Sequence, residues 1–339
     1  MNIFPNYSSS IKDPYLIQIG DNLFVLSFHV MKLLPALHML KKAQAERKIQ
    51  ENSLIVETSS GSFAYGIALA CTELKLPFAI VTDHKIDPLI KEQVMGQKGI
   101  LYIVRKKAEN GGIQQARLNK LHEVLAANTG SFWPCQYDNP DNQEAYHSAG
   151  ERLIETLGKN LILVGSVGSG GSTCGLITAM RRHNNDIPLI GVDTFNSVLF
   201  GMEDGPRMLR GLGNSIIPKN LHHWYFDEVH WVSAHLAFNA TRNLHSSHGL
   251  FCGPTTGAAY AVGQWISKLN PLQKTILISP DLGHRYLSSV YNAKWMKKQG
   301  FFHPLNQTSP AKVLHPKEAQ GDWACFSWGR KTLDTVLVR

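Results

Sequence analysis

Short apolar segments alternate with longer amphipathic segments along most of the chain. The short ones are rich in Ile and Val and lie at residues 23–26, 53–56, 78–81, 100–104, 161–164, 189–192 and 275–278. Segments with helical periodicity lie between them, at residues 33–47, 62–74, 89–96, 113–127, 143–157, 173–183, 234–246 and 256–268. Nearly all-apolar strands that alternate with helices are typical of parallel sheets covered on both faces, so the pattern predicts an α/β fold.

Breaks in this pattern divide the chain. The sequence Asn-Pro-Asp-Asn at 139–142 interrupts it, and prolines weaken it after about residue 300. A chain of 339 residues has room for about two domains. We predict a smaller domain over 33–145 and a larger one formed by 1–32 and 146–300, each with a mostly parallel sheet flanked by helices. Residues 301–339 would form a C-terminal arm that packs on the body or on a second subunit.

Composition and charge exclude several classes of protein. Hydrophobic residues make up 43% of the chain and charged residues 18%, which rules out wholesale disorder. The net charge of +8 is spread along the sequence in short runs such as 105–107, which favours a solvated basic surface over a nucleic-acid site. The five cysteines have no close spacing and predict no disulfide framework. No membrane-length apolar stretch and no leader-like start is present, so we expect a cytoplasmic protein without a membrane partner.

Two loops have the composition of an anion site. Residues 57–62 read Glu-Thr-Ser-Ser-Gly-Ser and residues 168–173 read Gly-Ser-Gly-Gly-Ser-Thr, and each follows a predicted strand and opens a predicted helix. A small-residue turn there exposes backbone N–H groups at the positive end of the helix dipole. The plainer interpretation is that Ser and Gly only cap the helices. Two such loops in one chain favour a bound phosphate together with a bound carboxylate.

Familiar nucleotide and hydrolase motifs do not fit these loops. Neither has the Lys of a P-loop, and Thr173 stands where a dinucleotide fingerprint needs glycine. Asp193, at the end of the next strand, could be a ribose ligand, so a nicotinamide enzyme stays a remote alternative. No Gly-x-Ser-x-Gly elbow is present. The histidines form no His-Glu-x-x-His motif, so we expect no metal site.

The first loop carries a family resemblance. Residues 55–70 resemble the segment Glu-x-Thr-Ser-Gly-Asn-Thr-Gly-x-x-Leu-Ala of the cysteine synthase family, fold-type II enzymes that use pyridoxal phosphate. Five further segments match in the family's order: 136–140, 168–172, 191–193 with 197–201 and 211–213, 253–259, and 280–288. The resemblance runs from about residue 15 to residue 298. It implies a fold like that of the tryptophan synthase β subunit, with the cofactor in the cleft between two domains.

Three stretches resemble one branch of that family more than the housekeeping cysteine synthases. They lie at residues 81–88, at Gly111 and Gly112 with Arg117, and at 133–137. The branch is that of the 2,3-diaminopropionate synthases of siderophore pathways. Membership would make the chain an amino-acid biosynthetic enzyme of siderophore or secondary metabolism.

The resemblance assigns the cofactor site. It implies that Lys32 is the Schiff-base lysine and the base on Cα–H, although the loop around Lys32 lacks the family's Asn-Pro-x-Gly-Ser-x-Lys-Asp-Arg pattern. An ordinary surface lysine is the alternative. Ser62 stands where the family has an Asn that contacts the ring hydroxyl. Thr255 falls opposite the pyridine nitrogen, or else only caps a helix. The residues of the second loop bind the cofactor phosphate: Gly168, Ser169, Gly170, Gly171 and Ser172.

The substrate site follows in the same way. The resemblance implies that Ser59, Ser60, Gly61 and Gln136 bind the substrate carboxylate. Arg117 is a candidate for a second anion, either a leaving phosphate or a carboxylate on the nucleophile, since arginine can bind either in bidentate fashion. The alternative for Arg117 is an exposed arginine on a helix surface.

The activity implied is β-replacement on an O-activated L-serine, O-phospho- or O-acetylserine, through an aminoacrylate intermediate. The nucleophile would be an amine such as glutamate, and the enzyme a homodimer that acts on small amino acids. Two alternatives within the family are a cysteine synthase that uses sulfide and a β-eliminating lyase. A non-catalytic family member that binds a partner is a third, which an intact Lys32 opposes.

Overall fold

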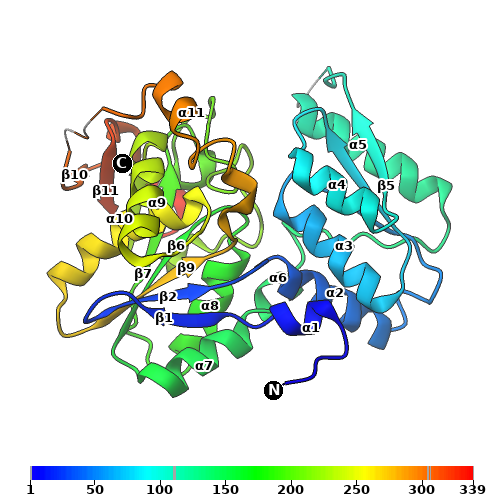
Figure 1. Ribbon diagram of the computed structural model, residues 1–339, viewed down its shortest axis with the longest axis horizontal. Coiled ribbons are helices and arrows are strands. Elements are labelled where there is room, and N and C mark those ends of the chain that lie inside the picture. Colours follow the sequence, from blue (N-terminus) through cyan, green and yellow to red (C-terminus); the bar gives the residue numbers. More distant parts are fainter. Residues whose placement is uncertain (1, 110–111, 304, 306, 339) are drawn as a thin grey trace. The chain divides into compact units, whose positions relative to one another are not determined.

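The computed structural model describes residues 2–109, 112–303, 305 and 307–338 (Figure 1). Gly111 therefore lies outside the described residues. The chain forms two compact units. The first unit comprises Met1–Asp13 and Val30–Ala145, and the second comprises Pro14–His29 and Tyr146–Arg339.

The first unit contains a three-stranded parallel sheet in the order β3-β4-β5. Its strands are β3 (Ile55–Thr58), β4 (Phe78–Asp83) and β5 (Ile100–Val104). Its helices are α1 (Tyr7–Ile11), α2 (Leu33–Ala45), α3 (Ser62–Leu74), α4 (Pro88–Gly96), α5 (Gly112–Ala127) and α6 (Asp141–Glu144). Alternation along β3 gives the sheet two apolar faces. Ile55 packs with the core residues of α2, α3 and α4, whereas Val56 packs with Leu121 and Val124 of α5.

The second unit contains an eight-stranded sheet in the order β1-β2-β9-β6-β7-β8-β11-β10. Strands β2, β9, β6, β7 and β8 run parallel, while β1 pairs antiparallel with β2, β11 pairs antiparallel with β8, and β10 pairs parallel with β11. The strands are β1 (Tyr15–Gln18), β2 (Leu23–Ser27), β6 (Leu161–Ser166), β7 (Leu189–Thr194), β8 (Glu228–Val232), β9 (Lys274–Ser279), β10 (Ala311–Lys312) and β11 (Trp323–Ser327).

Helices cover this larger sheet. They are α7 (His147–Leu157), α8 (Gly171–Arg181), α9 (Ala234–His248), α10 (Pro254–Leu269), α11 (Ala293–Lys298) and α12 (Leu333–Leu337), with short 3-10 turns at Val198–Phe200, His223–Tyr225, Gly283–Tyr286 and Pro316–Glu318. The apolar residues of α9 and α10 share a core with β2, β6, β7 and β9. Helix α8 packs against β6 and β7, and α7 packs on α8 (Figure 1). In the described residues, no helix is both long and apolar enough to cross a membrane.

The predicted α/β class with mostly parallel sheets is confirmed, and the differences have local causes. The helix expected over 143–157 is two helices, α6 and α7, which end and begin where the chain passes from one unit to the other. Strand β8 was missed because Glu228 and His230 interrupt its apolar pattern, although His230 is fully buried. Strand β1 was missed because it is a half-exposed edge strand of four residues.

The units also differ from the predicted domain bounds. Met1–Asp13 and residues 30–32 lie in the first unit, whereas the sequence pattern assigns them to the larger domain. The physical reason is that α1 packs on α3: Ile11 joins the core of that unit, and Ser8 Oγ donates to the Leu69 carbonyl over 3.3 Å. The described residues of the expected arm belong to the second unit, because β11 pairs with β8 and extends the sheet.

Candidate active site

Lys32 immediately precedes α2 and is held there by close helix packing. The Leu33 N–H donates to the Val30 carbonyl over 3.0 Å, which turns the chain into the helix. Helix α3 passes so near that a Cβ on Gly66 would lie 2.5 Å from the Lys32 carbonyl oxygen, so only glycine fits at that position. The Lys32 Nζ lies 6.0 Å from the centre of the Phe63 ring, in the first turn of α3. Lys32 is therefore positioned beside the first predicted anion loop.

The environment of Lys32 makes its amine a base near neutral pH. Burial lowers the pKa of Lys32 to about 8, and the negative charge of Glu57 opposes part of that shift. A lysine with its ordinary pKa would be almost wholly protonated at neutral pH. The interpretation of Lys32 as an ordinary surface lysine does not fit this environment.

The loop between β3 and α3 presents helix-terminal N–H groups. Ser59 is buried; its N–H donates to the Val81 carbonyl over 3.2 Å, and its Oγ accepts from the Gly61 N–H over 3.2 Å. Gly61 is the N-cap of α3, and its carbonyl accepts from the Ala64 N–H over 3.0 Å. The N–H groups of Ser62 and Phe63, which come before Ala64, have no carbonyl partner within the helix. Ser60, Gly61 and Ser62 are partly exposed there. This is the geometry of a carboxylate site.

Arg117 lies below this loop and not on the surface. It is buried on α5, where its Nε donates to Thr58 Oγ1 over 3.0 Å and its Nη1 to Asp83 Oδ2 over 2.9 Å. The alternative of an exposed arginine is therefore wrong. These two bonds use Nε and Nη1. A bidentate contact between Arg117 and a second anion, as the sequence predicts, would therefore have to use the remaining N–H groups of the guanidinium.

The second predicted loop lies in the second unit, between β6 and α8. Gly170 has φ +79°, and a Cβ there would lie 2.4 Å from the Asn220 carbonyl oxygen. The backbone at this position can therefore approach Asn220 only as glycine. Ser169 and Ser172 are buried, and the N–H groups of the first turn of α8 follow directly. Such a turn is a ready site for a phosphate group.

Thr255 supplies an unpartnered polar atom next to that loop. It lies in the first turn of α10 with 4% of its surface exposed, and its Oγ1 has no hydrogen-bond partner among the described residues. A buried hydroxyl without a partner is costly unless a ligand satisfies it. Gly211 bridges the two features, since a Cβ on Gly211 would lie 3.7 Å from Thr255 Cγ2 and a Cβ on Gly168 would lie 3.2 Å from the Gly211 carbonyl oxygen. The orphaned hydroxyl and the cradle at Gly170 fit a phosphorylated ring with a basic nitrogen.

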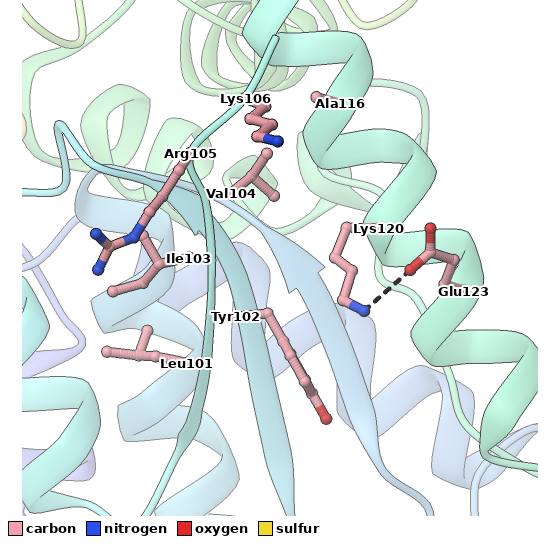
Figure 2. Close-up of a pocket in the computed structure, with 9 residues that line it drawn as sticks. All are labelled: Leu101, Tyr102, Ile103, Val104, Arg105, Lys106, Ala116, Lys120 and Glu123. Atoms are coloured by element: carbon pink, nitrogen blue, oxygen red, sulfur yellow. Dashed lines mark hydrogen bonds and ion pairs between the residues drawn. The ribbon is translucent and has the colours of Figure 1, made fainter. Parts of the chain in front are cut away.

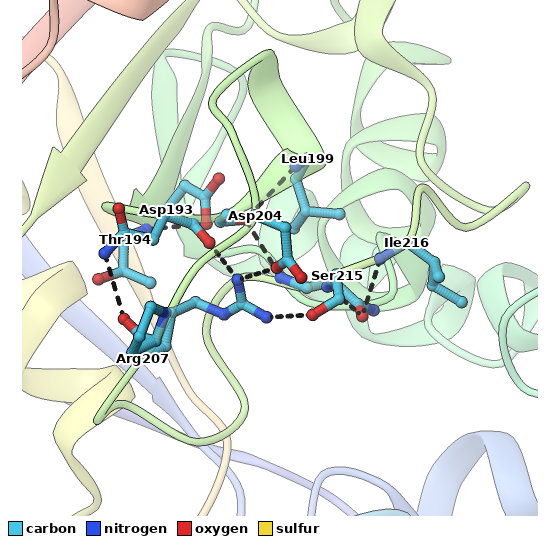
Figure 3. Close-up of polar contacts among 11 residues, drawn as sticks. Asp193, Thr194, Leu199, Asp204, Arg207, Ser215 and Ile216 are labelled. Atoms are coloured by element: carbon cyan, nitrogen blue, oxygen red, sulfur yellow. Dashed lines mark hydrogen bonds and ion pairs between the residues drawn. The ribbon is translucent and has the colours of Figure 1, made fainter. Parts of the chain in front are cut away.

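The segment that carries Gly211 is tied down by Arg207 (Figure 3). The Arg207 guanidinium donates to Asp204 Oδ1 over 2.7 Å, to Ser215 Oγ over 2.6 Å and to the Asn196 carbonyl. The Gly213 N–H then donates to the Val167 carbonyl over 2.9 Å, beside the phosphate loop. These bonds therefore fix the backbone around Gly211, which lies against Gly168 and Thr255.

Asp193 does not have the exposure of a ribose ligand. It is fully buried, and its Oδ1 accepts from the Thr194 N–H over 2.8 Å. Burial raises the pKa of Asp193 to about 7. A carboxylate that binds a ribose must face the ligand. This removes the residue that kept a nicotinamide cofactor as an alternative.

Two cavities in the described part of the first unit are lined by none of the predicted site residues. One of about 540 Å³ runs along β5 and α5, where Lys120 pairs with Glu123 over 2.9 Å (Figure 2). A second, of about 330 Å³, is lined by α2 and by residues from 132 to 141. Neither combines a base with an anion loop.

One described cluster has the donor atoms of a metal site. Glu228, His230 and Cys325 lie together where β11 pairs with β8. However, the Trp323 Nε1–H donates to His230 Nδ1 over 2.9 Å, so the ring proton of a neutral His230 stays on Nε2, which faces Glu228 at 2.7 Å. Trp323 and Glu228 therefore lie at the two ring nitrogens of His230 and account for this cluster, so we propose no metal site here.

Sequence reasoning missed several residues that shape these sites. Glu57 and Gly66 lie in the segment that carried the family resemblance, but their partners are distant in sequence and no local pattern indicates them. Asp83 lies in a stretch that we assigned to the siderophore branch without giving it a role. The structure makes it the partner of Arg117.

Comparisons with known proteins agree with this geometry. The family model described as "Pyridoxal-phosphate dependent enzyme" matches residues 24–280. The N-(2-amino-2-carboxyethyl)-L-glutamate synthase of Ralstonia nicotianae is 32% identical over 268 residues, which cover 78% of this chain and 79% of that protein. The cysteine synthase of Helicobacter pylori is 32% identical over 254 residues, which cover 74% of this chain and 82% of that protein.

Solved structures show the same fold at lower identity. The O-acetylserine dependent cystathionine beta-synthase of Helicobacter pylori has a TM-score of 0.78 at 23% identity, covering 86% of this chain and 100% of that one. The O-acetylserine sulfhydrylase isoform 3 of Entamoeba histolytica has a TM-score of 0.78 at 20% identity, covering 89% of this chain and 97% of that one. These likenesses confirm the expected fold. Taken with the family match, they show that this chain belongs to the pyridoxal-phosphate dependent enzymes of the cysteine synthase type.

Proposed function

We propose that this enzyme replaces the β-substituent of an O-activated L-serine with the amino group of glutamate. In this reaction the Cβ–O bond breaks, phosphate or acetate leaves, and a Cβ–N bond forms to the incoming amine. The observation that carries the proposal is the identity of 32% with an N-(2-amino-2-carboxyethyl)-L-glutamate synthase over most of both chains. The pathway would then be the biosynthesis of a siderophore or another secondary metabolite.

The roles of the chain's own residues follow from their environments. Bound pyridoxal phosphate supplies an electron sink for the substrate's α-carbon. Lys32 would hold the cofactor through its amine and, once that amine is free, would move the Cα proton, for which its lowered pKa suits it. The backbone from Gly168 to Ser172 would bind its phosphate, Thr255 Oγ1 would serve its ring nitrogen, and Ser62 would serve its ring hydroxyl.

The loop before α3 would grip the substrate. Ser59, Ser60 and Gly61 would bind the substrate carboxylate through the helix N-terminus, with the side chain of Gln136 as a further donor. Gln136 is buried, which would keep water from that bond. Binding there would fix the amino acid so that its Cα–H lies against Lys32.

The choice of nucleophile tests the function. We expect the enzyme to consume O-phosphoserine or O-acetylserine with glutamate faster than with sulfide, as measured by mass spectrometry of the products. Faster cysteine formation would support the second candidate, a cysteine synthase, which the similarity to the Helicobacter pylori cysteine synthase favours. Release of pyruvate and ammonia without either nucleophile would show a β-eliminating lyase. No turnover despite bound cofactor would indicate a non-catalytic binding protein.

We also propose that Arg117 supports the substrate loop through Thr58. Replacing Arg117 with alanine leaves Asp83 buried without its partner, a change that costs about 3–5 kcal/mol in other proteins. We expect a lower melting temperature and a higher KM for the serine ester. Asp83→Asn is the matched variant, because it keeps the guanidinium group but weakens its anchor, and it should raise the same KM by a smaller factor. A rise confined to the KM for glutamate in Arg117→Ala would instead make Arg117 the ligand of the second anion.

We propose a homodimer in the cytoplasm as the working form. The five cysteines all lie among the described residues and form no disulfide there, as suits a reducing compartment. Met208, Ile216 and Ile217 expose large apolar side chains along one segment of the second unit, which suits burial against a second copy.

A further inference from the structure

Glu57 is a buried carboxyl group at a critical point of the first unit. It is the third of the four residues of β3, which ends at Thr58 before the Ser59–Gly61 turn, and 1% of its surface is exposed. A buried carboxylate is costly unless the protein supplies compensating bonds. The hydrogen bonds that compensate for the burial of Glu57 therefore indicate which segments it connects.

Each described hydrogen bond of the Glu57 carboxyl group comes from an N–H donor. Its Oε1 accepts from the Thr58 N–H over 2.7 Å and from the Trp133 indole Nε1 over 3.0 Å, and its Oε2 accepts from the Gln136 N–H over 3.4 Å. Burial raises the pKa of Glu57 to about 7, and these donors act in the opposite direction. The arrangement suits an ionised carboxylate, which is purely an acceptor.

These bonds reach a segment that the sheet itself does not hold. Backbone pairing ties Phe132 to β3, through the Phe132 N–H to the Leu54 carbonyl and the Val56 N–H to the Phe132 carbonyl, both over 2.9 Å. This pairing is a single bridge between Phe132 and Ile55. Glu57 makes the next connection, at Trp133 and Gln136.

The Gln136 peptide is consequently fixed on both sides. Its N–H points to Glu57, and its carbonyl accepts from Asn142 Nδ2 over 2.5 Å. The proposed function makes Gln136 and the Ser59–Gly61 turn two halves of one carboxylate grip. The Glu57 carboxyl group accepts from the N–H of Thr58, directly before the turn, and from the N–H of Gln136, so it links the backbone of the two halves.

We propose that Glu57 is a positioning residue: its carboxylate couples the turn after β3 to the Trp133–Gln136 segment, so that both halves of the substrate-carboxylate grip keep one spacing. This rests on the proposed function for the grip itself. The coupling between the two segments is a property of the chain with or without substrate.

Glu57→Gln tests the coupling with almost no change in shape. The amide of glutamine places an NH₂ group where one oxygen was, so it must face either Thr58 and Trp133 or Gln136, all of which donate. We expect the KM for the serine ester to rise on the order of tenfold, with kcat within a few-fold of the wild type. Hydrogen–deuterium exchange on the full-length protein should show faster exchange over residues 133–137 and unchanged exchange in β4.

Two further variants sharpen the test. Glu73→Gln is the matched control, because Glu73 is a nearly buried carboxylate of the same unit that pairs with Lys41 and touches neither segment; it should leave exchange at 133–137 unchanged. Trp133→Phe removes one donor and keeps an aromatic ring. It should produce a smaller rise in both readouts, and it preserves the test if Glu57→Gln does not fold.

The outcomes separate this proposal from the proposed function. Unchanged exchange at 133–137 in both Glu57→Gln and Trp133→Phe would overturn the coupling, whatever the kinetics. Faster exchange in those variants of an enzyme that accepts neither serine ester would support the coupling and count against the proposed function instead. Faster exchange with an unchanged KM would show that the two segments are coupled for stability alone and would overturn the positioning role.

Discussion

Replacing Lys32 with alanine is expected to lower turnover of every serine ester by about a thousandfold or more. A positioned general base contributes about 10²–10⁴-fold, and alanine also removes the amine that holds the cofactor. The wild-type rate should rise as the pH increases through about 8, because burial lowers the pKa of Lys32 to that value and the neutral amine is the active base. Turnover measured against pH tests both expectations.

Lys48→Ala is the matched control for that experiment. Lys48 belongs to the same unit, but its side chain is exposed. Among the described residues, its ion pair is with Glu46 alone. Such surface pairs contribute about 0–1 kcal/mol, so both activity and melting temperature should stay near the wild type. Borohydride treatment of the wild type followed by peptide mass mapping should place the cofactor on the peptide that contains Lys32. Cofactor found on another lysine would contradict the assignment.

The features predicted correctly from the sequence are those encoded by nearby residues. The segment 62–74 forms a helix with those same bounds, because its small and apolar residues repeat with helical periodicity after a Ser-Gly cap. The two glycine- and serine-rich loops were located for the same reason. Cap residues, turn glycines and the strands before them lie within about ten positions of one another.

The features that were missed depend on contacts between distant residues. Arg117 was expected at a ligand or at the surface, because its partners Thr58 and Asp83 are 59 and 34 positions away. Glu57 was recognised as part of a motif, but Trp133 is 76 positions from it. The role of a buried polar residue depends on such distant partners. Hydrophobic periodicity does not indicate which residues these partners are.

Gly170→Ala is expected to weaken cofactor binding by about a hundredfold or more. Alanine in a left-handed conformation costs about 1–2 kcal/mol, and its Cβ would overlap the Asn220 carbonyl oxygen, which lies 2.4 Å from the Cβ position. The loop must therefore shift, and the N–H groups that follow it no longer point to the phosphate position. Each hydrogen bond to a charged group is worth about 1.5–3 kcal/mol, so two lost bonds account for this loss of affinity.

The comparison with Gly249→Ala isolates the cause. Gly249 also has a positive φ, of +68°, but a Cβ there would meet no atom within 4 Å. It ends α9 in the same unit, so alanine should lower the melting temperature without changing the cofactor affinity. Fluorescence titration of the apo forms with pyridoxal phosphate gives the affinities, and thermal denaturation gives the stabilities. Equal affinities in the two variants would mean that the phosphate binds elsewhere, because the strain of a positive φ is common to both and only Gly170 is followed by the turn from Gly171 to Ser172.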